Sequence, residues 1–159
     1  MPTSIRFWKC RTALLIAGLF LFFAAPVTSH IARAESPPNM TVWKSPYCGC
    51  CAHWVTHMRN NGFHVTVKDV EDLGRVKRRE GISEHLQSCH TAKIGEYVIE
   101  GHVPAKDVKR LLKDRPKAHG LAVPGMPSGS PGMENGQIDR YDVLLLKRDG
   151  APSVFSSHP

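Results

Sequence analysis

Two hydrophobic patterns divide the chain. Residues 12–25 form an apolar run of 14 residues without a charge, whereas from residue 41 onward apolar positions alternate or recur at helical spacing. The run is shorter than the roughly 20 residues that a membrane-spanning helix needs. The second part has the pattern of a folded domain of helices and strands.

The N-terminal run has the features of a signal peptide. Arg6, Lys9 and Arg11 make its start positive, and Ala32-Arg33-Ala34 supplies the small residues of a signal-peptidase site. We predict that residues 1–34 are a signal peptide cleaved after Ala34, that the protein is exported, and that no stable membrane span remains after cleavage. A retained N-terminal anchor is the alternative.

The remaining chain predicts short strands alternating with helices. Residues 35–40 are expected to form a flexible leader and residues 41–159 a single domain, whose size is usual for one domain. The predicted strands and helices are, in chain order, a strand at 41–44, a helix at 52–61, a strand at 63–70, helical segments at 71–80 and 83–87, a strand at 96–100, a helix at 105–113, a long irregular loop at 116–135, and a hairpin of strands at 141–147 and 153–156.

The first half of this order is the opening of a thioredoxin-like fold: a strand, a CxxC motif at a helix start, a second strand and a second helix. We therefore predict an α/β, thioredoxin-like domain with a central mixed sheet flanked by helices and a C-terminal β-hairpin. The later order departs from thioredoxins, because a helix separates the strand at 96–100 from the hairpin. Thioredoxins instead pair two strands directly and end with a helix, so the strand order of the C-terminal part stays open.

Charge excludes one class of partner. Removal of residues 1–34 takes away four of the 21 basic residues and none of the 14 acidic ones, so the net charge falls from +7 to +3. The remaining basic residues alternate with acidic ones in helical segments, as on solvated helix faces. No basic stripe with interleaved aromatic residues is present, and we expect no nucleic-acid partner.

The candidate chemistry lies in the cysteines, of which the mature chain keeps Cys48, Cys50, Cys51 and Cys89. Three of them begin the first helix, where the helix dipole and free N–H groups favour thiolates. Their crowding argues against a purely structural disulfide framework, because adjacent cysteines rarely bridge without strain. Thiol–disulfide exchange needs only Cys48 and Cys51, whereas a soft metal gains from a third sulfur. Metal binding is favoured, and exchange and a structural disulfide remain open.

Cys89 and His90 are further candidate ligands. They precede a predicted strand, at the place where thioredoxin-like oxidoreductases have a cis-proline facing the CxxC motif. This chain has no proline between Pro46 and Pro104, and two metal-ligand types stand there instead. A buried, inert Cys89 is the alternative.

The other candidates are weaker. Met126 and Met133 lie in the long loop, and thioethers suit Cu(I). Packing of both methionines onto the core is the alternative. His53 and His57 have the i, i+4 spacing of a shared metal site but complete no zinc motif, and solvated side chains are the simpler interpretation.

The motifs together resemble those of a known family. The stretches that carry the resemblance are Cys48-Gly49-Cys50-Cys51 with Trp54, and residues 88–92, 97–104, 121–127 and 129–134. Over residues 41–156 the chain is similar to the periplasmic metal-binding family that includes the copper-resistance protein CopG, long catalogued as a domain of unknown function. The resemblance implies a thioredoxin-like fold that binds copper through the CxCC cysteines and Cys89. It also implies a multinuclear, thiolate-bridged Cu(I) cluster and a role in copper tolerance through a change in the oxidation state of copper.

We therefore expect an exported, periplasmic protein of copper resistance that holds Cu(I) through Cys48, Cys50, Cys51 and Cys89. His90 is expected to bind the metal or to donate a hydrogen bond to a residue that binds it. Met126 and Met133 are expected to make soft contacts with the metal. Zinc is the alternative metal, and a thiol–disulfide oxidoreductase using Cys48 and Cys51 is the alternative function. Metal binding is favoured over turnover, with a copper oxidoreductase as the enzymatic alternative and no catalytic residue assigned. The expected partners are metal ions and other periplasmic copper-handling proteins.

Overall fold

The computed structural model describes residues 39–159. The predicted signal peptide and most of the predicted leader lie outside the described residues. Within the described part, no helix has the length and apolar character needed to cross a membrane.

Strands and α-helices alternate through the first half of the described chain. The elements are β1 (Met40–Lys44), α1 (Gly49–Asn60), β2 (Val65–Asp69), α2 (Leu73–Arg79), a 3-10 turn (Glu84–Leu86), β3 (His90–Ile94), β4 (Tyr97–Glu100), α3 (Ala105–Asp114), β5 (Ala118–Ala122), β6 (Tyr141–Lys147) and β7 (Ser153–His158). The predicted leader is one residue too long, because Met40 already belongs to β1.

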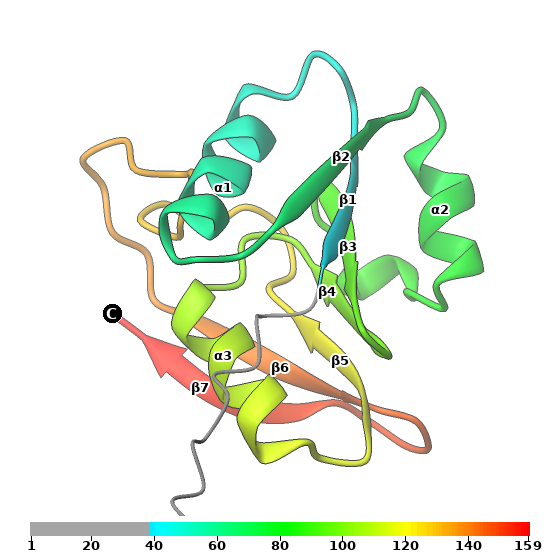
Figure 1. Ribbon diagram of the computed structural model, residues 1–159. Helices are drawn as coiled ribbons and strands as arrows, with labels where there is room; N and C mark the ends of the chain where they lie inside the picture. Colours follow the sequence, from blue (N-terminus) through cyan, green and yellow to red (C-terminus); the bar gives the residue numbers. More distant parts are fainter. Residues whose placement is uncertain (1–38) are drawn as a thin grey trace, which may run out of the picture. The chain divides into compact units, whose positions relative to one another are not determined.

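All the strands join one mixed sheet in the order β2-β1-β3-β4-β5-β6-β7. β2 runs parallel to β1 and β5 parallel to β4, and the other neighbours are antiparallel. Figure 1 shows α1 and α3 on one side of the sheet and α2 on the other. The pairing of β1 with β3 places Lys44 opposite His90 and Met40 opposite Ile94. β3 therefore runs from the cysteine-bearing end of the sheet to its opposite end.

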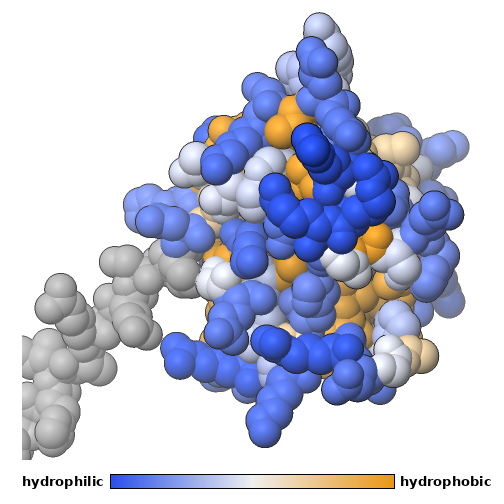
Figure 2. Space-filling view, turned by 90° about the vertical axis from the view of Figure 1, so that its right-hand side faces the viewer, coloured by the Kyte–Doolittle hydropathy of each residue, from blue (hydrophilic) through white to orange (hydrophobic). Residues whose placement is uncertain are grey.

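The main core lies between the sheet and the face with α1 and α3. Cys51, Trp54, Val55 and Met58 recur at helical spacing along α1 and are all buried on its inner face. On the other face a smaller apolar cluster lies beside a buried ion pair between Lys77 and Glu100. The surface there is mainly hydrophilic, with smaller hydrophobic areas between the charged side chains (Figure 2).

The predicted fold class is confirmed: the domain is α/β, its mixed sheet is flanked by helices, and β6 and β7 form the C-terminal hairpin. The predicted opening, a strand, a CxxC motif at a helix start, a strand and a helix, is also present.

Two strands were missing from the prediction. β3 lies between the predicted helical segment at 83–87 and the predicted strand at 96–100, where no element was predicted. It pairs directly with β4, and α3 then separates β4 from the hairpin of β6 and β7, as predicted. β5 lies inside the predicted irregular loop. Its Gly120 packs so closely on β4 that an added Cβ would lie 1.7 Å from the carbonyl oxygen of Val98, which explains a glycine in a strand interior.

Candidate metal centre

The turn between β1 and α1 places three cysteines at the helix start. Ser45 begins this turn, and its carbonyl oxygen accepts a hydrogen bond from the Cys48 N–H at 3.1 Å. Cys48 is the N-cap of α1, and its Sγ accepts a hydrogen bond from the Cys51 N–H at 3.3 Å. The sulfurs therefore lie at the positive end of the helix dipole.

Cys89, which directly precedes β3, brings a fourth sulfur to this cluster. Its Sγ lies 3.8 Å from that of Cys50, and the Sγ atoms of Cys48 and Cys50 are 3.5 Å apart. Cys48 and Cys51 form a disulfide, and Cys50 and Cys89 are free thiols. All four sulfurs lie within 4.8 Å of one another. The predicted approach of Cys89 to the CxCC motif is thus present in the structure.

A second group shares Cys89 and consists of Cys89, His90 and His102, whose ligand atoms also lie within 4.8 Å of one another. The Cys89 Sγ is 2.9 Å from His102 Nε2 and 3.4 Å from His90 Nδ1. The Nδ1 of His102 faces the carbonyl oxygen of Pro131 at 2.8 Å, so this nitrogen carries the proton. The lone pair of Nε2 therefore points toward the Cys89 sulfur.

Burial sets the protonation of this second group. It lowers the pKa of His102, and it lowers the pKa of His90 well below its ordinary value, so both imidazoles are neutral near pH 7. It also raises the pKa of Cys89 to about 12, and the adjacent Cys50 adds to the rise. Cys89 lies outside the helix and is a neutral thiol in the metal-free site.

His90 has an unusual environment for a buried polar side chain. It is fully buried, its ring lies 4.4 Å from that of Trp54, and its Nε2 has no hydrogen-bond partner among the described residues. A buried, unpaired polar atom is unfavourable and calls for an explanation. The other ring nitrogen, Nδ1, is the one that faces the Cys89 sulfur, at 3.4 Å.

Sequence reasoning did not assign a role to His102. The residue appeared only within the stretch 97–104 that carries the family resemblance. It lies on the connection between β4 and α3, remote from the cysteines along the chain, and only the folded sheet brings it to Cys89. The only local feature in the sequence that could have drawn attention to His102 is its position just before the predicted helix at 105–113.

A buried charge network supports the segment that carries Cys89. Glu100 accepts hydrogen bonds from Lys77 Nζ at 2.5 Å, from the Thr91 hydroxyl at 2.6 Å and from the Ser88 N–H at 2.7 Å. The Ser88 hydroxyl also donates a short hydrogen bond to the carbonyl oxygen of Gly125. Ser88 and Thr91 flank the Cys89-His90 pair, so the network holds both candidate ligands in place.

The loop after β5 closes over the start of α1. An added Cβ on Gly132 would lie 2.7 Å from the Cys50 carbonyl oxygen and 2.8 Å from the Trp54 nitrogen, so only glycine permits this approach. Met133 follows it and is partly buried, whereas Met126 is 53% exposed. Contact of either sulfur with a bound metal stays a prediction.

The remaining histidines have structural or solvated positions. His57 Nε2 accepts a hydrogen bond from the Ala105 N–H at 3.1 Å and so caps the start of α3. His53, His64 and His85 are exposed. The i, i+4 pair of His53 and His57 therefore forms no metal site among the described residues.

The donor set fits a soft metal ion. Thiolate sulfur and neutral imidazole are the ligands that Cu(I) and Zn(II) prefer, and both types meet here. The Cys48–Cys51 disulfide must first take up two electrons and two protons to supply all four thiols.

Comparison with known proteins relates this arrangement to a family. The family described as "Protein of unknown function, DUF411" matches residues 86–133, which include Cys89, His90 and His102. A search of curated protein sequences finds no significant match.

Two solved structures of a copper resistance protein CopG, described as form 2 and form 1, have a similar fold and sequence. Both are 44% identical to this chain and cover 77% of it, with TM-scores of 0.74 and 0.73. The match takes in 99% and 98% of the solved chains. The resemblance found in the sequence is confirmed, and the chain belongs to the family of the copper resistance protein CopG.

Proposed function

We propose that this protein binds Cu(I) in copper resistance through Cys48, Cys50, Cys51 and Cys89. The convergence of four cysteine sulfurs from two distant segments within 4.8 Å is the observation that carries the proposal. The solved relatives are named for copper resistance, which selects copper among the soft metals. Zinc, which also takes four thiolates, is the alternative.

Cys50 distinguishes this site from a simple CxxC pair. Its sulfur lies between those of Cys48 and Cys89, at 3.5 Å and 3.8 Å. A thiolate in that place can bridge neighbouring ions, and the short spacing of all four sulfurs supports a multinuclear cluster. His90, with its unused Nε2, is a further ligand in this proposal, and Met126 and Met133 supply soft contacts from the covering loop.

Redox exchange with copper follows from the same cysteines. Oxidation of Cys48 and Cys51 to their disulfide releases two electrons and two protons, which balances the reduction of two Cu(II) ions to Cu(I). The disulfide between these residues supports such an exchange. The role belongs in the periplasm, after removal of residues 1–34 as a signal peptide, and other periplasmic copper-handling proteins are the partners that deliver or receive the metal.

Copper counting under competition tests the proposal. The chain from Glu35 onward is reduced, loaded with Cu(I) in the presence of a competing chelator, and analysed for metal. More than one tightly held copper per chain is expected, and none would refute the proposal. Zinc that is retained against excess Cu(I) would favour the zinc alternative.

Substitution of single cysteines refines the test. Cys50→Ser is expected to lose tightly bound copper, because it removes the central sulfur and leaves the Cys48–Cys51 pair intact. Exposed His53→Ala is the matched control on the same helix and is expected to keep its copper. Equal copper binding by Cys50→Ser and the unchanged protein would contradict the role of Cys50.

The second candidate is a thiol–disulfide oxidoreductase, which the Cys48–Cys51 disulfide favours. This activity uses an attacking and a resolving cysteine and has no need of Cys50. Rapid reduction of a model disulfide that survives Cys50→Ser, without tight copper binding, would establish it in place of the copper function.

A further inference from the structure

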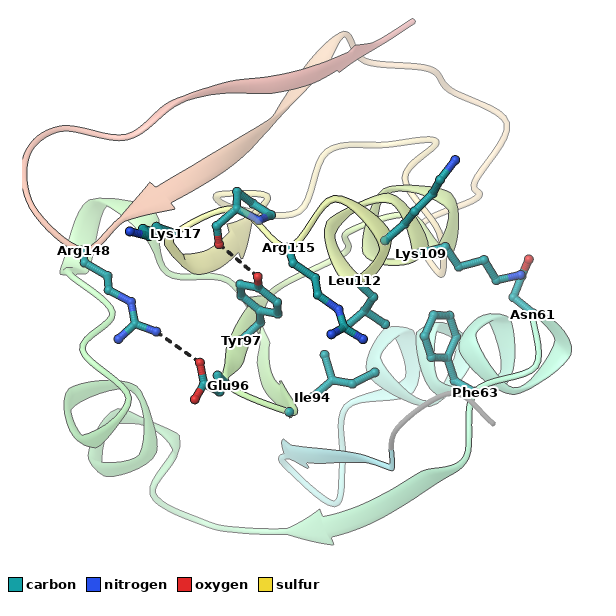
Figure 3. Close-up of a pocket in the computed structure, with 13 residues that line it drawn as sticks. Asn61, Phe63, Ile94, Glu96, Tyr97, Lys109, Leu112, Arg115, Lys117 and Arg148 are labelled. Atoms are coloured by element: carbon teal, nitrogen blue, oxygen red, sulfur yellow. Dashed lines mark hydrogen bonds and ion pairs between the residues drawn. The ribbon is translucent and has the colours of Figure 1, made fainter. Parts of the chain in front are cut away.

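A cavity of about 880 Å³ lies at the end of the sheet remote from the cysteines. It is lined by the end of α1, the β3–β4 turn, the last turns of α3 and the end of β6 (Figure 3). Ile94 in its wall pairs with Met40 at the start of β1, whereas the cysteines follow the end of β1. The volume is within the range of pockets that take small molecules.

The floor of the cavity is apolar. Phe63 and Ile94 are buried, Leu112 is half-buried, and Figure 3 shows all three beside the hollow. The Tyr97 hydroxyl already donates to the carbonyl oxygen of Pro116 at 2.9 Å, so Tyr97 presents its ring rather than its polar group. An aromatic or aliphatic body would find contacts here without leaving a polar group unpaired.

The rim is strongly basic. Five cationic residues line the cavity with Glu96 as the sole carboxylate, namely Lys109, Lys113, Arg115, Lys117 and Arg148. Glu96 is 89% exposed and pairs with Arg148 at 3.6 Å. Among the ion pairs of the described residues, none joins Lys109, Lys113 or Lys117 to a carboxylate. A solvated helix face accounts for isolated lysines, but these charges come from two parts of the chain, residues 109–117 and Arg148, and surround one apolar hollow.

Arg115 adds a conformational argument. Its φ of 47° is in the left-handed region, and it is the sole non-glycine residue with positive φ within 39–159. This position after a helix is usually glycine, which adopts the conformation without steric cost. Figure 3 shows the Arg115 side chain extended toward Leu112 and Ile94 over the hollow. An arginine in a strained position at a pocket is a feature of functional sites.

We propose that this cavity binds a small organic anion, a carboxylate or sulfonate carried on an aromatic or aliphatic body. The body packs on Phe63 and Leu112, and the anionic group lies among Lys113, Arg115 and Lys117. The basic rim concentrates such anions near the pocket. This site is separate from the cysteine cluster and independent of copper binding.

A matched pair of fluorescent probes tests the proposal on the chain from Glu35 onward. Anilinonaphthalene sulfonate has the predicted anion on an aromatic body, and phenylnaphthylamine has similar rings without the charge. The sulfonate is expected to bind one molecule per chain, about tenfold more tightly than the neutral probe, and more weakly as salt is added. Equal binding of both probes would overturn the proposal, because the hollow would then recognise apolar surface alone.

Variants locate the binding. Lys113→Gln with Lys117→Gln is expected to weaken sulfonate binding about tenfold and to leave the neutral probe unchanged. Arg115→Gly is expected to weaken it while keeping the turn, since glycine accepts this φ. Lys106→Gln, on the exposed face of the same helix, is the control and is expected to have no effect. Unchanged sulfonate affinity in both pocket variants would overturn the proposal.

Competition identifies the source of the anion. Small aromatic or aliphatic carboxylates are expected to displace the sulfonate probe. Displacement only by vesicles of anionic phospholipid, or only by a glutamate-rich peptide, would overturn the assignment to a small molecule.

Discussion

The buried pair of Lys77 and Glu100 makes a sharp stability prediction. The Lys77 and Glu100 side chains are only 5% and 0% exposed, and Lys77 Nζ lies 2.5 Å from Glu100 Oε1 and 3.1 Å from Thr91 Oγ1. Lys77→Met replaces the ammonium group with an apolar group of similar length. The substitution leaves the carboxylate of Glu100 buried without its counter-ion.

The expected loss is about 3–5 kcal/mol of unfolding free energy at neutral pH, the range for an uncompensated buried charge. The Thr91 hydroxyl and the Ser88 N–H still donate to Glu100, which keeps the loss within that range rather than above it. Both donors flank Cys89 and His90, so a shift of Glu100 also moves the copper ligands. We expect Cu(I) affinity to fall together with stability.

Acidification should reduce the loss. Burial raises the pKa of Glu100 in the folded protein, while Lys77 opposes the rise, so Lys77→Met raises this pKa further. A carboxyl whose folded pKa exceeds its unfolded value contributes most stability below the unfolded pKa, and that contribution is lost as pH rises through the folded pKa. The variant is therefore expected to be closest to wild type near pH 4 and furthest from it near pH 8.

Urea unfolding of the chain from Glu35 onward, followed by circular dichroism across this pH range, measures the effect. Lys44→Met is the matched control, because Lys44 pairs with Asp69 at 2.8 Å but that carboxylate is 53% exposed, and a loss of about 0–1 kcal/mol is expected. Adding Glu100→Gln to Lys77→Met should recover part of the stability. A loss below about 1 kcal/mol for Lys77→Met at pH 8, or a loss that grows on acidification, would refute the reasoning.

The further predictions concern three residues. Cu(I) binding should release protons and strengthen with pH, because the pKa of Cys89 is raised to about 12 and its thiol must ionise; an indicator titration that finds equal release in Cys89→Ser would contradict this. His57→Ala should lose about 1 kcal/mol of stability with the cap on Ala105, whereas His57→Gln keeps an acceptor. Burial lowers the pKa of His57, so thermal melts of wild type should show stability falling as pH drops below about 6.5. His90→Leu should stabilise the metal-free protein by about 1 kcal/mol, by removing the unpaired Nε2, and weaken Cu(I) binding in a chelator competition; lower stability would show that His90 has a structural role.

Local patterns in the sequence predicted the elements that are amphipathic on their own. The buried face of α1, with Cys51 and Trp54 on it, follows from the spacing of apolar residues along a helix. The apolar run of β6 and the turn before β7 likewise predicted the hairpin. Each of these signals lies within a dozen residues, which is why it can be read without the fold.

β3 and β5 escaped prediction because their own residues carry little strand signal. β3 contains polar Thr91, which is buried only because Glu100 on β4 accepts its hydroxyl hydrogen bond. β5 contains Gly120, which is required by the close approach of β4. In both cases a neighbouring strand, remote from the pattern itself, supplies the hydrogen bonds and the packing.

The sequence by itself determined the cysteine motif at a helix start, the α/β class and the identity of most candidate ligands. Only the tertiary structure decided which of them meet. It brought Cys89 to 3.8 Å from Cys50, added His102 at 2.9 Å from Cys89, and left His90 Nε2 buried and unpaired. The reason is physical: a metal site needs donor atoms within a few ångströms in space, and residues about 40 positions apart reach that distance only when β1 and β3 pair in one register.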